Sequence, residues 1–248
     1  MSRRPFNRRV APTDIIIRMI ETMSIHSLDE LTRLLQISSP AFPLGSFHYS
    51  QGLETAVDNQ IVVDASTFED WLMMQMRESM ANLDMPTLFR LVSTYTDEDL
   101  DRFEYWVNFL VANRETLELR QEEQARGQAM LRILENLDIN LDDRTRRLIG
   151  TSQLAGHAVL AGVWGLQVAP LAATLLYTFL ENQVTAGIKT IPLGQSAGQN
   201  LIGSVGAHIP SWVEYASRLD DDDIGASTHG LAILCSLHET QYTRLFRS

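Results

Sequence analysis

The apolar residues of this chain recur at intervals of three and four positions, which is the period of an amphipathic helix. In residues 97–135 they are Leu100, Phe103, Trp106, Val107 and Leu110, and the stretch predicts one or two long helices. Further helices are predicted for residues 28–35, 152–166, 170–189, 195–207 and 224–237. No window shows a convincing alternation of apolar and polar residues, as a strand would. The pattern therefore predicts an all-α protein, a single-domain helical bundle of about nine or ten helices.

Several polar residues have the spacing of helix starts. Ser66 and Glu69 stand three apart ahead of an apolar run, which is typical of a capping box. Asp84 precedes a proline by two positions and is expected to cap the helix that follows. The four aspartates at 220–223 are expected to favour the positive end of a helix that begins at residue 224. Gly127, inside a long helical stretch, predicts a close approach of a neighbouring helix.

Composition narrows the class of protein. The chain has 248 residues, 45% of them hydrophobic, and a net charge of −11, which argues against a nucleic-acid partner. No apolar run approaches the roughly 20 residues that a membrane-spanning helix needs. Four arginines within the first nine residues predict a disordered lead-in, residues 1–24. Cys235 is the only cysteine, so the sequence predicts neither a disulfide nor a thiolate metal cluster. No secretory signal is evident, and the expected location is the cytoplasm.

Searches for catalytic patterns give no complete match. His238 and Glu239 begin a zinc-protease pattern, but Tyr242 stands where its second histidine is required. The segment around Lys189, which is the only lysine in the chain, lacks the glycine spacing of a phosphate-binding loop. The sequence therefore predicts no catalytic residue, no metal ligand and no enzyme. A helical metallohydrolase built around His48, Glu54 and His238 remains the alternative.

The last eleven residues, HETQYTRLFRS, are unusual for a chain end. They interleave Tyr242, Leu245 and Phe246 with Arg244 and Arg247, and aromatic residues and arginine carry much of the energy of protein interfaces. We expect this tail to be mobile in the free protein and to become ordered on a partner. Docking of the tail on the chain's own core is the alternative.

Four segments together resemble the urease accessory protein UreF family: residues 39–54 (SPAFPLGSFHYSQGLE), 114–120 (RETLELR), 181–199 (ENQVTAGIKTIPLGQSAGQ) and the tail. They occur in the family's order and extend the resemblance over about residues 31–248. Ser46 stands where many members have a second glycine, and His48 where serine is common, so this loop departs from the family pattern at two positions.

The resemblance implies an all-helical chaperone component that binds UreD (UreH in some species) and the GTPase UreG and acts with them on apo-urease. The complex couples GTP hydrolysis to nickel insertion; whether this chain modulates that hydrolysis stays open. It further implies a homodimer that binds no cofactor stably, with GTP on UreG and nickel passing through the complex. Residues 25–237 would form the helical domain and 238–248 the partner-binding tail. A generic helical adaptor unrelated to nickel is the second alternative.

Carried over segment by segment, the resemblance predicts three groups of partner-binding residues. The first segment supplies Tyr49, Gln51 and Glu54. Residues 181–199 and the tail supply a longer set: Glu181, Gln183, Lys189, Gln195, Gln199, His238, Glu239, Tyr242, Arg244, Leu245, Phe246 and Arg247.

Overall fold

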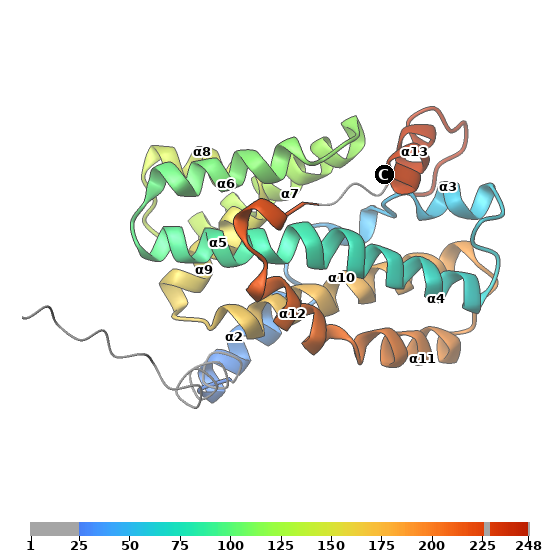
Figure 1. Cartoon of the computed structure of the whole chain (residues 1–248), viewed down its shortest axis with the longest axis horizontal. Helices are drawn as coiled ribbons and strands as arrows, with labels where there is room; N and C mark the ends of the chain where they lie inside the picture. The colour runs from blue at the N-terminus through green and yellow to red at the C-terminus, as the bar shows by residue number, and fades with distance from the viewer. Residues whose placement is uncertain (1–24, 226–228, 248) are drawn as a thin grey trace, which may run out of the picture.

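The computed structural model describes residues 25–225 and 229–247, and helices make up most of that length (Figure 1). The described residues contain no strand, so the all-α prediction is confirmed. The predicted lead-in, residues 1–24, lies outside the described residues. In chain order the elements are α2 (Leu28–Ser38), the 3₁₀ turn η1 (Ser46–His48), α3 (Leu53–Asp58), α4 (Ala65–Met74), the π-helix η2 (Gln75–Asp84), α5 (Met85–Thr96), α6 (Leu100–Ala112), α7 (Leu117–Asn136), α8 (Asp143–Thr151), α9 (Gln153–Trp164), α10 (Val168–Thr190), α11 (Gln195–Gly206), α12 (Ile209–Arg218), the 3₁₀ turn η3 (Asp221–Asp223) and α13 (His229–His238).

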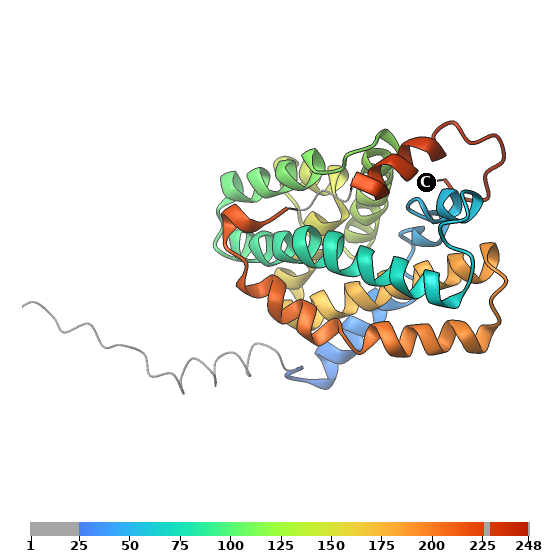
Figure 2. The same cartoon turned by 45° about the vertical axis from the view of Figure 1, so that its right-hand side comes forward.

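Two long elements organise the bundle. The first is a rod in which α4, η2 and α5 follow one another without a break (Figure 1). The second is α10, which packs against α2, α5, α11 and α12. Helices α6 and α8 lie at one end of the rod and α13 lies beside α3 at the other, while α7 packs on α8 and α9 and reaches α13 (Figure 2). This second end carries the chain's C-terminus.

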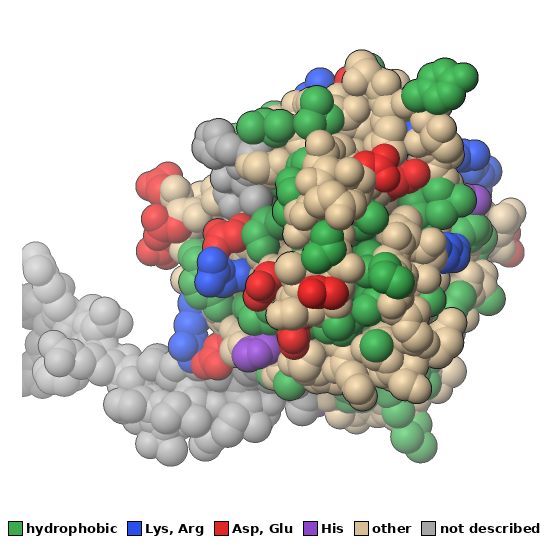
Figure 3. Space-filling model, turned by 90° about the vertical axis from the view of Figure 1, so that its right-hand side faces the viewer, with side chains coloured by type: hydrophobic (Ala, Val, Ile, Leu, Met, Phe, Trp, Pro, Cys, Tyr) green, Lys and Arg blue, Asp and Glu red, His purple; other side chains and the backbone are tan. Residues whose placement is uncertain are grey.

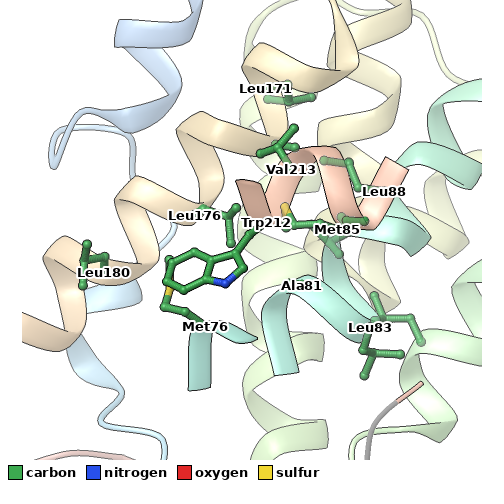
Figure 4. Packing of buried hydrophobic residues seen from close by; sticks show 14 of the residues in the cluster. Met76, Ala81, Leu83, Met85, Leu88, Leu171, Leu176, Leu180, Trp212 and Val213 are labelled. Atoms are coloured by element: carbon green, nitrogen blue, oxygen red, sulfur yellow. The ribbon is translucent and has the colours of Figure 1, made fainter. Parts of the chain in front are cut away.

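The core joins these layers through large apolar side chains. Trp212 of α12 reaches between Leu176 of α10 and Met76 of η2 (Figure 4). Each fully buried side chain of this size contributes about 1.5–3 kcal/mol by leaving water. Gly127 of α7 confirms the predicted close approach, because a Cβ there would lie 2.5 Å from the carbonyl oxygen of Ile149. Helices α7 and α8 can therefore pack backbone to backbone.

The predicted helix starts are wrong in three places. The capping box of α4 is formed by Asp64 and Thr67, whose amide donates to Asp64 Oδ1 at 2.9 Å, and Ser66 lies inside the first turn. Asp84 caps nothing, because η2 runs directly into α5 and the Asp84 side chain is buried and paired with Arg114. The described part of α13 begins at His229 rather than at 224, and Asp221 pairs with arginines of α5 and α6. In the last two cases a tertiary ion pair takes the carboxylate that the local pattern assigned to a helix end.

Candidate partner-binding site

The tail packs against the chain itself. Beyond α13 it turns back over α3 and α7, and Phe246 is only 7% exposed. The amide of Arg247 donates to the carbonyl oxygen of His48 at 2.8 Å. The structure therefore shows the docked alternative, and our expectation of a free tail is corrected for residues 239–247. His238 belongs to α13 as its last residue.

Glu54 holds the end of the tail. Its two carboxylate oxygens accept the backbone amides of Leu245 at 2.7 Å and Phe246 at 2.9 Å. It stands in the first turn of α3, after Gln51 and Gly52 at φ +50° and +81°. These two left-handed residues turn the chain sharply, and glycine adopts that conformation at no steric cost. The turn directs the Glu54 carboxylate away from its own helix and towards the tail.

His238 and Glu118 form the second half of this contact. His238 is fully buried, with Nδ1 2.7 Å from Glu118 Oε2 and Nε2 3.4 Å from Glu54 Oε2. The other oxygen of Glu118 accepts from Arg244 Nη1 at 2.8 Å. We call Glu54, Glu118, His238 and Arg244 the clasp. It joins α3, α7, α13 and the tail through buried carboxylates, which are costly to leave unpaired.

Glu239 fastens the same region to α7. Its Oε1 accepts the amide of Leu117 at 3.1 Å and that of Glu118 at 3.4 Å, in the first turn of α7. These amides have no partner within their own helix, and a carboxylate is favoured at the positive end of a helix. Glu239 therefore has a structural task, although we predicted that it contacts a partner.

The outer side of this region is apolar and uncovered. Tyr242 is fully exposed and Leu245 is 62% exposed, and Ile233 and Leu237 point outwards from α13. We call these four residues the tail face. Figure 3 shows this end of the molecule, where apolar side chains are spread among neutral and acidic ones and basic ones lie towards the edges. An exposed apolar surface of this kind is typical of protein interaction sites.

The second predicted segment meets the tail at Lys189. The Lys189 ammonium lies 5.8 Å from the centre of the Phe246 ring, close enough for a cation–π contact. Gln195 and Gln199 are exposed on α11, one turn apart, as predicted. Glu181 of α10 lies on the wall of a groove of about 410 Å³, which the loop around Phe42 and Phe47 completes. Thus all three predicted groups supply residues to one end of the molecule.

Not every predicted residue reaches this surface. Tyr49 and Gln183 are buried, and Gln51 is half-buried, with its amide donating to Glu122 Oε1 at 2.8 Å. All three line a partly enclosed pocket beneath the site. In the structure described here they support the surface from below.

A buried ion-pair network also lies beneath the site. Arg114 donates to both oxygens of Asp84, at 2.5 and 3.1 Å, and to Glu123 at 2.7 and 3.0 Å. Burial alone would lower the pKa of Arg114, but the two carboxylates raise it above its usual value. Burial would likewise raise the pKa of Glu123, yet Arg114 and the hydroxyl of Ser152 hold it below its usual value. Arg114 and Glu123 are therefore both charged at neutral pH.

The residues of the hydrolase alternative do not gather in one site. Glu54 and His238 are buried in the clasp, whereas the His48 side chain is exposed and packs on Phe47. Among the described residues, no group of three His, Cys, Asp or Glu side chains could hold a metal ion. Burial raises the pKa of the Cys235 thiol to about 12, so little reactive thiolate exists at neutral pH. No helix in the described ranges is both long and apolar enough to cross a membrane.

Comparison with known proteins supplies the family. A family model described as UreF matches residues 62–206, which is more than half of the chain. The chain belongs to the UreF family. The urease accessory protein UreF of Pseudomonas putida is 45% identical over 218 residues, 88% of this chain and 97% of that protein. The UreF proteins of an Enterobacter species and of Klebsiella pneumoniae are 40% and 39% identical, over 90% and 89% of this chain and 99% and 98% of their own.

Two residues of the UreF-like site escaped the sequence analysis. Glu118 and Arg114 lie in the quoted segment 114–120 but were not assigned a role. The available signal was their position in a family-like segment, and their acidic and basic character alone did not distinguish them from solvated charges. Their partners, His238 and Asp84, are 120 and 30 positions away along the chain.

Proposed function

We propose that this chain is a non-enzymatic component of a nickel-delivery complex, in which it binds UreD through the tail face and the GTPase UreG beside Lys189. The observation that carries the proposal is the docked tail. It buries the polar clasp and leaves Tyr242 and Leu245 uncovered, so the chain presents apolar anchors on a fixed support. Membership of the UreF family supports the choice of UreD, UreG and apo-urease in this proposal.

In this proposal the chemistry is divided among the partners. UreG binds and hydrolyses GTP, and nickel is the cargo that the complex inserts into urease. The chain's own part is to hold UreD and UreG in a fixed relation, in the cytoplasm and as a homodimer. Closed two-fold dimers are the commonest soluble oligomers, and such symmetry would place two copies of each partner in the complex.

Truncating the tail face should break the contact with UreD. Replacing an anchor residue of an interface with alanine weakens the binding free energy by about 2 kcal/mol or more. This loss corresponds to a roughly 25-fold rise in Kd. We therefore expect the double variant Tyr242→Ala/Leu245→Ala to lose UreD in native mass spectrometry while its circular dichroism stays unchanged. The same spectra of the unaltered protein should show two copies of this chain per complex.

Tyr215→Ala is the matched control, because Tyr215 is an exposed tyrosine on α12. It should bind UreD normally. If the tail-face variant bound as well as the control, UreD would have to dock elsewhere. Binding of neither UreD nor UreG by the unaltered chain would favour the adaptor unrelated to nickel.

The Lys189→Ala variant should lower urease activation in cells without lowering the abundance of the protein. Lys189 is exposed at the end of α10 and contacts the tail through Phe246, so its ammonium can meet UreG and steady the tail. Gln195→Ala should act in the same direction and less than additively, because neighbouring residues of one site are coupled. Arg77→Ala, which removes another exposed cation, is the control. If urease were fully activated in cells that carry Lys189→Ala, Lys189 would be a surface charge without a role in activation.

A further inference from the structure

A partly enclosed pocket of about 90 Å³ lies beneath the partner-binding site, with side chains from α7, α9 and α10 in its wall. Three of its wall residues, Gln153, His157 and Gln183, are at least nine-tenths buried. Gln153 Oε1, His157 Nε2, Gln183 Oε1 and Arg126 Nε are buried, and none of these four atoms has a hydrogen-bond partner among the described residues. A buried polar atom without a partner costs about 1–3 kcal/mol. Four such atoms around one cavity therefore point to a bound ligand.

The state of His157 defines what the ligand must offer. His157 Nδ1 lies 2.9 Å from the carbonyl oxygen of Gln153, which can only accept, so Nδ1 carries the proton. Burial lowers the pKa of His157 to about 4, and the ring is therefore neutral at pH 7. Its Nε2 is left as a lone pair that must accept. The cavity thus holds three acceptors, on His157, Gln153 and Gln183, and one donor, the N–H of Arg126.

The charged groups around the cavity are already satisfied by one another. Arg114 is paired with Asp84 and Glu123, and Arg126 with Glu122 at 3.0 Å. Glu123 also accepts from the Ser152 hydroxyl at 2.8 Å and from the Gln153 amide at 3.1 Å. The four atoms without partners are a neutral imidazole, two neutral amides and one N–H. A small neutral ligand with both donors and acceptors suits them, whereas an ion would need to displace an existing pair.

We propose that this cavity is a specific hydration site, whose bound water molecules donate to His157 Nε2, Gln153 Oε1 and Gln183 Oε1 and accept from Arg126 Nε. The space open to the centres of water molecules, about 90 Å³, is well above the roughly 10–15 Å³ that one water needs, so the pocket admits more than one. Each offers two donors and two acceptors and can bridge two or more of the wall atoms. The waters thereby connect α7, α9 and α10 at a point where no direct hydrogen bond joins these four atoms.

The hydration site assigns a role to Gln183, which we had predicted to contact a partner. Gln183 lies on α10, six residues before Lys189, and only 2% of its surface is exposed. Through the waters it would fix α10 against α7, the helix that carries Glu118 of the clasp. Gln183 is therefore a positioning residue, acting on the partner surface through bound solvent and the helices around it.

A high-resolution crystal structure of the metal-free full chain tests the site directly. We expect at least two ordered waters at about 2.7–3.2 Å from the four atoms. In Gln183→Leu the water bonded to Gln183 should be lost and the others kept. Gln199→Leu, which alters an exposed glutamine on α11, should leave all of them in place. Direct bonding between the wall side chains, or an ion with anomalous scattering, would overturn the proposal.

Nitrogen NMR of histidine-labelled protein tests the same point in solution and remains informative if Gln183→Leu does not fold. The expected spectrum shows His157 with a proton on Nδ1 and an Nε2 shifted by accepting a hydrogen bond, together with transfer of magnetisation from water. A protonated Nε2, or no transfer from water, contradicts a hydrated cavity. Neither experiment involves UreD or UreG, so its outcome is independent of the proposed function.

Discussion

Replacing Glu54 with glutamine is expected to release the tail from α3. The Glu54 carboxylate accepts two backbone amides of the tail and contacts His238, and an amide group cannot repeat that pattern because its nitrogen would face an N–H donor. Hydrogen bonds to charged groups contribute about 1.5–3 kcal/mol each. The oxygen of the glutamine can still accept one amide, so losing the other bond, about 1.5–3 kcal/mol, should speed hydrogen exchange of the Leu245 and Phe246 amides roughly 10- to 150-fold. Mass spectrometry of the C-terminal peptide measures this change.

The same variant should lose affinity for UreD, because the anchors of the tail face would then have to be ordered at the moment of binding. Fixing a backbone residue costs about 1–2 kcal/mol. Glu98→Gln is the control, since Glu98 is exposed in the turn between α5 and α6. It should exchange and bind like the unaltered protein. Unchanged exchange at Leu245 and Phe246 in Glu54→Gln would show that the docked tail does not depend on the clasp.

The clasp also shows where sequence reasoning stopped. The composition of the tail marked it as an interaction segment, and that observation needed no structure. The residue that holds it, Glu54, lies 191 positions before Leu245, and nothing in the local pattern of either segment identifies the other. The choice between a free and a docked tail depends on that distant pairing. The sequence could therefore predict the segment but not its place.

The helices themselves were more accessible, because their signals are local. The period of apolar residues located α6, α7, α9, α10 and α11, and Gly127 marked a real backbone contact. It was harder to predict which side of each helix is buried and which is exposed. Gln183 and Lys189 stand six apart on one helix, yet the first is buried against the cavity and the second is exposed. Only the positions of neighbouring helices distinguish these two polar residues, so both were predicted to contact a partner.

Asp84 illustrates the same limit in energetic terms. A helix cap contributes about 1 kcal/mol, and the local sequence around Asp84 fits one. Burying a carboxylate without a counter-ion costs several kcal/mol, so the pairing with Arg114 decides where the side chain goes. Arg114 is 30 residues away and was quoted only for its place in a family-like segment. The stronger interaction was non-local, and the local prediction failed for that reason.

Arg114→Met should therefore destabilise the protein more than any surface substitution. The variant leaves Asp84 and Glu123 buried without their shared cation, and breaking a buried pair in this way costs about 3–5 kcal/mol. For a chain of this length each kcal/mol lowers Tm by about 2–4 °C, so we expect a loss of roughly 10 °C in calorimetry. Arg102→Met removes an exposed pair with Asp221 and should change Tm by much less.

The dependence of this deficit on pH separates loss of charge pairing from loss of packing. In the unaltered protein the pKa of Glu123 is held below its usual value, so its contribution to stability is present above the unfolded-state pKa and is lost as pH falls. In Arg114→Met burial opposes ionisation of Glu123 instead, and protonation relieves the unpaired charge. The difference in unfolding free energy between the two proteins should therefore shrink as pH is lowered from 7 towards 4. Adding Glu123→Gln to Arg114→Met should recover part of the lost stability at pH 7. If neither the lower pH nor the second substitution reduced the loss of unfolding free energy, Arg114 would stabilise the protein through packing alone.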